Sequence, residues 1–289
     1  MSKFSKTILI ITVIGIALCS IGLAFGANYG IYLNKTGWHP VPKVAKEITR
    51  TFEDVKTINA NYQNSAIEVI PGSEFSVTAK YAFAEPQIVY ENGTLTIDSS
   101  ENHTWFNIGF MFTVEKLTIT VPGNASLDGI NIYNDNGSIK VSNKIFAKNF
   151  VIQNDNGSIK IDGVTAEEAK VRNKNGSIAL ANFAGINCKV SNDNGAIKLE
   201  NFASVTGDIR NENGSITGDN IKGKNEFKNE NGSIKISAEN LSDFYIEAYN
   251  ENGSCKVNGE KIKRPIGDPN SENQIIAENQ NGSIKILGK

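Results

Sequence analysis

Few residues in the chain have the types and spacing that catalysis requires. The sequence contains two histidines, His39 and His103, and neither lies at a spacing that would pair it with a serine or cysteine nucleophile. The Asn-Gly-Ser tripeptides lack the lysine that a phosphate-binding loop places after its last glycine. We therefore expect no catalytic residue, no cofactor-binding residue and no enzymatic activity.

The segment Asn154-Asp155-Asn156-Gly157 comes nearest to a metal-binding motif. An EF-hand loop needs further carboxylates and a distal glutamate, and a calcium-binding β-roll needs an aspartate soon after paired glycines. Here serine and isoleucine follow the glycine, so we predict no metal site. Acidic residues two positions before such glycines alternate with lysines three positions after them, which predicts charge compensation between neighbouring units.

The three cysteines predict neither a disulfide nor a redox site. Cys19 lies in an apolar N-terminal segment, while Cys188 and Cys255 take positions that apolar residues hold elsewhere in the repeat. If the units stack about 4.8 Å apart, Cys188 and Cys255 are about 14 Å from each other. That separation is beyond the reach of a disulfide, so we expect both to be core residues.

A repeat dominates the sequence after Tyr133 and must position these side chains. Eight Asn-Gly pairs recur with a nearly constant spacing, and the steps from glycine to glycine are 20, 19, 19, 19, 18, 21 and 29 residues. A fixed period of about 20 residues indicates stacked structural units. The pairs are Asn136-Gly137, Asn156-Gly157, Asn175-Gly176, Asn194-Gly195, Asn213-Gly214, Asn231-Gly232, Asn252-Gly253 and Asn281-Gly282.

Apolar residues alternate with polar ones on both sides of each Asn-Gly pair. Ile159 and Ile161 follow Gly157 at the second and fourth positions, with Lys160 between them, and most copies repeat this pattern. Alternation with a period of two predicts short half-buried strands. Asn-Gly between such strands is also typical of β-hairpins, so a meander of hairpins is the competing architecture.

A second corner in each unit favours a solenoid over the meander. An asparagine followed by an apolar residue recurs six to eight residues after the glycine, at Asn182, Asn201, Asn220 and Asn240. Two corners in about 19 residues leave room for two or three short sides per coil. We therefore predict an all-β fold: a parallel β-solenoid (β-helix) of about 19-residue coils, preceded by an N-terminal transmembrane helix.

The position three residues before the glycine is asparagine in all eight copies. We expect these side chains to point inward and to hydrogen-bond to one another along the stack, as amides do in cross-β ladders. We also expect left-handed backbone angles at both residues of each Asn-Gly pair, and a hydrogen bond from the following serine to the turn. The asparagines are Asn134, Asn154, Asn173, Asn192, Asn211, Asn229, Asn250 and Asn279.

The N-terminus predicts a membrane anchor. Residues 7–34 contain no charged side chain, and about 20 apolar residues suffice to cross a bilayer as a helix. A cleaved signal peptide is the alternative, and a lipoprotein anchor at Cys19 is disfavoured because Leu18 precedes the cysteine. The short N-terminus before the span favours a C-terminal domain outside the cytoplasm.

We divide the chain into four parts, which are given at the end of this paragraph. Within them, two segments depart from the repeat pattern. The aromatic segment 102–112 is either an exposed contact loop or an apolar lid on the core, and the insertion 260–272 is either a functional loop or a tolerated solvent loop. The parts are a transmembrane anchor at 1–36, a stalk or linker at 37–51, an N-terminal β region and cap at 52–130, and the repeat solenoid at 131–289.

Several of these features occur together in one known family. They are the single N-terminal span, the serial Asn-Gly-Ser-Ile coils, the strand ending Ile119-Thr120-Val121-Pro122, and Leu127-Asp128-Gly129-Ile130. In these features the chain resembles, over 52–289, a bacterial family of candidate adhesins that includes LiaG-like envelope proteins of unknown function. The resemblance implies a bacterial, extracytoplasmic, membrane-attached β-solenoid, and it brings no catalytic motif.

The sequence and the resemblance together predict a membrane-anchored adhesin, or an envelope-associated interaction or structural protein, without catalysis. The expected partners are the membrane and an envelope protein or cell-wall polymer, and the net charge of −2 argues against nucleic acid. One alternative is a self-assembling filament in which the last coil, residues 285–289, pairs end to end with another chain. Another is an enzyme acting on envelope polysaccharide, which would need clustered carboxylates.

Overall fold

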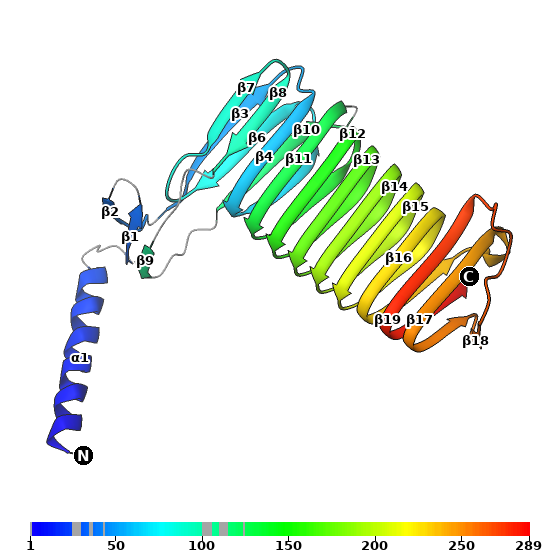
Figure 1. The fold of residues 1–289 in the computed structure, drawn as a ribbon. Helices are drawn as coiled ribbons and strands as arrows, with labels where there is room; N and C mark the ends of the chain where they lie inside the picture. The colour runs from blue at the N-terminus through cyan, green and yellow to red at the C-terminus, as the bar shows by residue number, and fades with distance from the viewer. Residues whose placement is uncertain are drawn as a thin grey trace.

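The computed structural model describes residues 2–24, 30–34, 37–42, 44–99, 106–109, 115–123 and 125–289. Figure 1 shows a helix and a small sheet at one end of the molecule, followed by a long stack of strands. The fold is mostly β, and its long parallel sheet confirms the predicted solenoid. His103 and the aromatic positions 105 and 110–112 lie outside the described residues.

Helix α1 (Lys3–Ala24) is apolar over most of its length. Residues 3–21 have a mean hydropathy of 2.1, and none of this segment is buried against the rest of the protein. By length and composition the helix can cross a membrane, and a signal sequence shares these properties. The predicted apolar N-terminal helix is therefore confirmed, whether it serves as an anchor or as a signal.

Three short strands form a separate antiparallel sheet directly after the helix. The order is β2 (Gly37–Pro40), β1 (Gly30–Asn34) and β9 (Phe106–Gly109). Strand β9 comes from the aromatic segment of the sequence. Part of that segment therefore lies beside the stretch of chain that follows α1.

The other strands form one 16-stranded sheet that winds through the coils. The long repeat strands pair with their neighbours in parallel and in register, so that Asn154 lies opposite Asn134 and Asn173. Parallel neighbours exclude a meander of hairpins, whose neighbours would be antiparallel. The repeat strands are β11 (Ser126–Asn136), β12 (Ile139–Asn156), β13 (Ile159–Asn175), β14 (Ile178–Asn194), β15 (Ile197–Asn213), β16 (Ile216–Ala238), β17 (Phe244–Val257) and β19 (Asn273–Gly288).

The N-terminal region supplies one further coil and a cap. Asn64 lies opposite Asn136, and Ile67 lies opposite Ile139, so Asn64-Ser65 takes the place of an Asn-Gly pair. Two groups of strands continue the sheet beyond this coil. One group pairs onward from the strand before its corner, and the other pairs onward from the strand after it. The elements are β3 (Lys46–Phe52), β4 (Thr57–Asn64), β5 (Ala66–Gly72), β6 (Phe75–Tyr81), β7 (Gln87–Glu91), β8 (Thr94–Asp98) and β10 (Lys116–Pro122).

Columns of identical or similar apolar side chains fill the inside of the coils. Ile159, Ile178 and Ile197 occupy equivalent positions and are fully buried, as the period-two alternation predicts. The rings of Phe183 and Phe202 stack 5.7 Å apart at the next inward column. Each such side chain contributes about 1.5–3 kcal/mol by leaving water, so the free energy of the rod comes from repetition.

Glycine is required at the first corner because neighbouring coils approach closely there. The repeat glycines have φ between +125° and +157°. A Cβ on Gly157 would collide with the carbonyl oxygen of Gly137, and the same collision recurs from coil to coil. The prediction of left-handed angles at both residues of each pair is wrong for the asparagine. Among the described residues, no asparagine of the eight pairs has a positive φ.

The predicted second corner is confirmed in the middle coils. Asn182, Asn201 and Asn220 have φ near +50°, and Gly163 has φ +78° at the equivalent place. Asparagine tolerates this conformation better than other residues that carry a side chain. Asn240 differs, since it has φ −136° and precedes the short 3-10 helix η1 (Leu241–Asp243).

The coils do not stack in the order of the sequence. Strand β19, the last in the chain, lies between β16 and β17, as Figure 1 shows by the labels at the far end. The insertion 260–272 carries the chain back, and on the way Ile266 exchanges backbone hydrogen bonds of 2.8 and 2.9 Å with Ile246. The prediction that residues 285–289 form a free end coil is therefore wrong. The outer edge belongs to β17 and to the short strand β18 (Glu260–Lys261).

Candidate interaction surface

Each coil has two sides that carry outward-pointing side chains, and the Asn-Gly corner separates these two sides. We call the side formed by the residues before the corner the groove face, and the side formed by the residues after it the lysine face. Outward side chains on the groove face stand two, four and six residues before the glycine; those on the lysine face stand one, three and five residues after it. Because the strands are in register, equivalent residues form straight rows along the rod.

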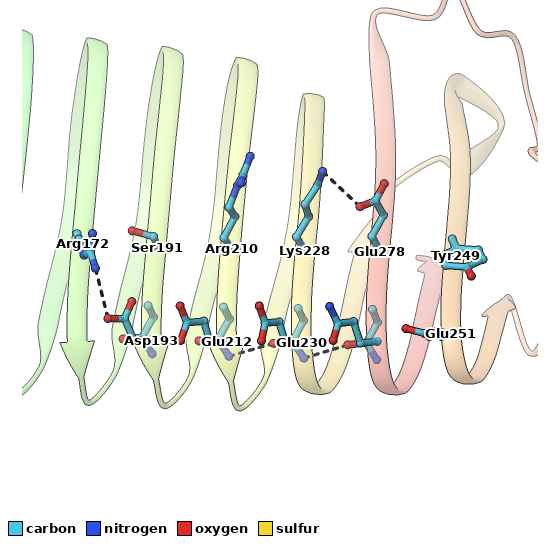
Figure 2. A pocket seen from close by; sticks show the side chains of 15 residues that line it. Arg172, Ser191, Asp193, Arg210, Glu212, Lys228, Glu230, Tyr249, Glu251 and Glu278 are labelled. Carbon is cyan, nitrogen blue, oxygen red and sulfur yellow. Dashed lines mark hydrogen bonds and ion pairs between the residues drawn. The ribbon is translucent and has the colours of Figure 1, made fainter.

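The groove face is hollowed over β13 to β19, where a depression of about 560 Å³ crosses several coils. Figure 2 shows two rows of polar side chains along it, one standing four residues before the glycine and the other two residues before it. The labelled residues of the first row are Arg172, Ser191, Arg210, Lys228, Glu278 and Tyr249, and those of the second are Asp193, Glu212, Glu230 and Glu251.

Ion pairs on the groove face join these two rows to each other and to the row that stands six residues before the glycine. Arg172 lies 3.4 Å from Asp193, and Lys228 lies 3.3 Å from Glu278 (Figure 2). Lys228 also lies 2.8 Å from Glu226. The hydrogen bond to Glu226 is the main cause that raises the pKa of Lys228 above its ordinary value. The cations Arg172 and Lys228 are therefore paired, whereas Glu212, Glu230 and Glu251 have no ion pair among the described residues.

The predicted pairing of acidic residues with the lysines after the corner is wrong. No ion pair among the described residues joins the two faces. Asp155, for example, pairs with Lys174 of the neighbouring coil at 2.6 Å, on its own face. The corner turns the chain between the two positions, so their side chains point to different sides of the rod.

The buried asparagines hydrogen-bond to the backbone and mostly not to one another. The Nδ2 of Asn192 donates to the carbonyl of Gly176 at 3.1 Å, and that of Asn173 donates to the carbonyl of Gly157 at 2.9 Å. Their Oδ1 atoms accept no hydrogen bond. Direct amide contacts within this row occur only at Asn211–Asn229 and Asn229–Asn279, each at 3.2 Å, among the residues that the structure describes.

The continuous amide ladder stands instead at the asparagine next to the glycine. The Nδ2 of Asn194 donates to the Oδ1 of Asn175 at 3.0 Å, and this contact repeats along the exposed corner at 2.8–3.1 Å. A second ladder follows the other corner, where Asn220 donates to Asn201 and Asn201 to Asn182 at 2.9 Å. The sequence pattern predicted a ladder, but the structure places it on the surface.

In the described part of the chain, the histidine and the cysteines do not form a reactive cluster. His39 lies in β2, and no group of three or more His, Cys, Asp or Glu side chains in the described part of the chain could hold a metal. Cys188 and Cys255 are free thiols. Burial raises the pKa of the Cys188 thiol to about 12, with a smaller contribution from Glu168.

Several solved structures are similar to the chain at low sequence identity. A candidate adhesin from Bacteroides fragilis is 15% identical with a TM-score of 0.42, covering 83% of this chain and 97% of its own. A candidate lipid-binding protein from Parabacteroides distasonis is 12% identical with a TM-score of 0.47, covering 85% and 98%. A candidate cell adhesion protein from Clostridium sporogenes is 14% identical with a TM-score of 0.26, covering 85% and 100%.

A family model gives the assignment. The model described as Toastrack DUF4097 matches residues 55–287, which is nearly the region 52–289 over which the sequence resembles the bacterial candidate adhesins. No curated protein matches the chain. The chain therefore belongs to the Toastrack DUF4097 family.

Proposed function

We propose that this protein is a membrane-anchored, extracytoplasmic adhesin or envelope-associated interaction protein that acts without catalysis. One observation carries the proposal: a rod of stacked coils displays straight rows of side chains, while the apolar helix α1 lies at the opposite end from β17 and β18 (Figure 1). Such a rod can project a binding surface away from a bilayer.

The rows favour binding to an extended partner. Strand pairing is continuous through 12 strands in the order β18-β17-β19-β16-β15-β14-β13-β12-β11-β4-β8-β7, so the spacing of side chains along the rod is fixed by backbone hydrogen bonds. The groove face adds a depression several coils long. An envelope protein or cell-wall polymer can contact many equivalent positions on such a surface.

We also propose a role for each part of the chain. Residues 1–36 anchor the protein, 37–51 link it to the rod, 52–130 cap the solenoid and 131–289 form the repeats. Strand β3 starts at Lys46 and pairs with β6, so the linker that we propose already joins the cap at its end.

Protease treatment of intact protoplasts tests the location. We expect digestion of residues 52–289 while a cytosolic control protein survives, and recovery of the α1 peptide in the membrane fraction. Protection of the rod until the cells are lysed would place it in the cytoplasm and remove the adhesin function. Release of the whole rod into the medium, with residues 1–24 absent, would identify α1 as a cleaved signal.

The filament alternative assumed that residues 285–289 form the end coil of the rod, and they do not. Residues 285–288 belong to β19, which pairs with β16 as far as Gly288 and with β17 as far as Ile286. The outer edge is strand β17, which Ile266 covers at Ile246 and the two-residue strand β18 covers at Lys256 and Val257, and covered positions disfavour pairing with another chain. Sedimentation of the purified protein over a range of concentrations is expected to show no growing polymer.

A further inference from the structure

Four lysines lie in line across four adjacent strands at the far end of the lysine face. Lys235 of β16 is in register with Lys285 of β19, and Lys285 is in register with Lys256 of β17. Lys256 in turn lies opposite Lys261 of β18. With strands about 4.8 Å apart, the four ammonium-bearing positions form a line about 14 Å long. We call it the lysine line.

The lysine line is not compensated by acidic side chains. Within the described chain, none of its four members has an ion pair. The outward residues beside Lys235 and Lys285, two positions on, are the neutral Ser237 and Leu287. Like charges placed directly opposite each other on a sheet are destabilising, so this arrangement costs folding free energy that an anionic ligand would recover.

Two other lysines on the same face differ in this respect. Lys198 lies 3.5 Å from Glu200. Lys140 is in register with Glu68 and helps to lower the pKa of that carboxyl, after the larger effect of Lys116. Lys160, which is in register with Lys140, has no ion pair within the described chain either, so the last coils differ in that they carry four such lysines in line with no acidic residue in register.

Hydroxyl groups accompany the lysine line. Ser233, Ser283 and Ser254 stand in register one row closer to the corner and are half-buried. Contrary to the prediction from the sequence, no hydroxyl of these three makes a hydrogen bond within the described chain, so each can donate to a ligand oxygen. The insertion continues past β18 with exposed Lys263 and Arg264.

We propose that the lysine line binds a linear anionic polymer with repeating phosphate groups. A row one residue wide matches an extended chain better than the flat surface of a membrane, and it offers ammonium and hydroxyl donors to phosphate oxygens. It also lies at the end of the rod that is remote from α1 (Figure 1). The inference names a partner class for the proposed interaction protein and rests on that function only for its location in the envelope.

Binding of long-chain inorganic polyphosphate to the full-length protein in neutral detergent tests the proposal. The variants are Lys235→Gln/Lys285→Gln and the same pair combined with Lys256→Gln/Lys261→Gln. The control is Lys140→Gln/Lys160→Gln, which removes the same charge as the double variant from two registered lysines that stand on the lysine face outside the lysine line. Relief of repulsion should leave the melting temperature of the lysine-line variants unchanged or higher.

We expect the four-lysine variant to bind polyphosphate at least about tenfold more weakly, since each exposed ionic contact contributes modestly, and the control to bind like the unchanged protein. An equal loss in the control, or no binding at all, would overturn the proposal. So would tight binding to phosphatidylglycerol vesicles that polyphosphate does not displace, because the partner would then be a lipid surface. Each result is independent of the protease test, which measures location alone.

Discussion

The side-chain amide of Asn279 donates a 3.1 Å hydrogen bond to the carbonyl of Gly232, which lies 47 residues earlier in the chain. Asn250, although earlier than Asn279, donates instead to Gly282 at 2.8 Å. The last coil is therefore inserted between the two coils that precede it in the sequence. The long final step of the repeat, 29 residues between glycines, is the length of chain that passes one coil and returns.

Cysteine cross-linking tests this order of coils. We expect Ser233→Cys/Ser283→Cys, in a chain also carrying Cys19→Ser and Cys255→Ala, to form a disulfide under mild oxidation. The two positions are paired on neighbouring strands, and strands about 4.8 Å apart bring Cα atoms into disulfide range. Mobility on a non-reducing gel measures the product.

The matched variant is Ser233→Cys/Ser254→Cys, which joins repeats that are consecutive in sequence. With β19 between them, these positions are about 9.6 Å apart, so no disulfide is expected. Cross-linking of this pair and not of the first would show that the coils stack in chain order.

Replacement of a buried asparagine is expected to destabilise the stack. Asn192→Ala removes the donor to the carbonyl of Gly176, and an unsatisfied buried acceptor costs about 1–3 kcal/mol of unfolding free energy. Asn194→Ala, which removes one rung of the exposed ladder, is expected to cost less than about 1 kcal/mol. Denaturant unfolding of the two variants checks the difference, and equal losses would contradict our assignment of the buried row.

Substitution of a corner glycine is expected to lower the free energy of unfolding more than either asparagine substitution does. In Gly195→Ala the new Cβ would collide with the carbonyl oxygen of Gly176. Because the neighbouring coils cannot move apart to relieve this clash, we expect the free energy of unfolding to fall by more than about 4 kcal/mol. Gly259→Ala is the comparison, since Gly259 has φ +86° but no atom within 4 Å of the added Cβ. It should lose only about 1–2 kcal/mol from the left-handed backbone. Similar melting temperatures for both variants would show that coil spacing is adjustable.

The Cys188 thiol is expected to report global unfolding. Burial raises its pKa from 9.0 to about 12, so between these pH values the unfolded chain carries mostly thiolate while the folded chain keeps the proton. Because the folded pKa is the higher one, the contribution of this site to stability is complete below pH 9 and declines as pH rises towards 12. Alkylation followed by mass spectrometry should modify Cys188 only as fast as the protein unfolds. Rapid modification of the native protein would contradict the burial.

The sequence by itself determined the coil and its inside. The glycine period, the second asparagine corner and the alternation around residues such as Ile197 require two turns and an apolar interior, and these are local properties of each repeat. The sequence also contains Asn-Gly pairs that do form hairpins. Asn92-Gly93 and Asn258-Gly259 have a positive φ at both residues, and neither pair has the asparagine that precedes the solenoid corners by two positions.

Only the tertiary structure decided which coils are neighbours and which side chains meet. Parallel coils with nearly the same pattern pair equally well in several orders, so local sequence could not place β19 between β16 and β17. The corner angle likewise decided that Asp155 and Lys160 point to different faces, and the close approach of backbones directed Asn154 to the carbonyl of Gly137. These outcomes depend on distances between coils, and no spacing along a single coil specifies them.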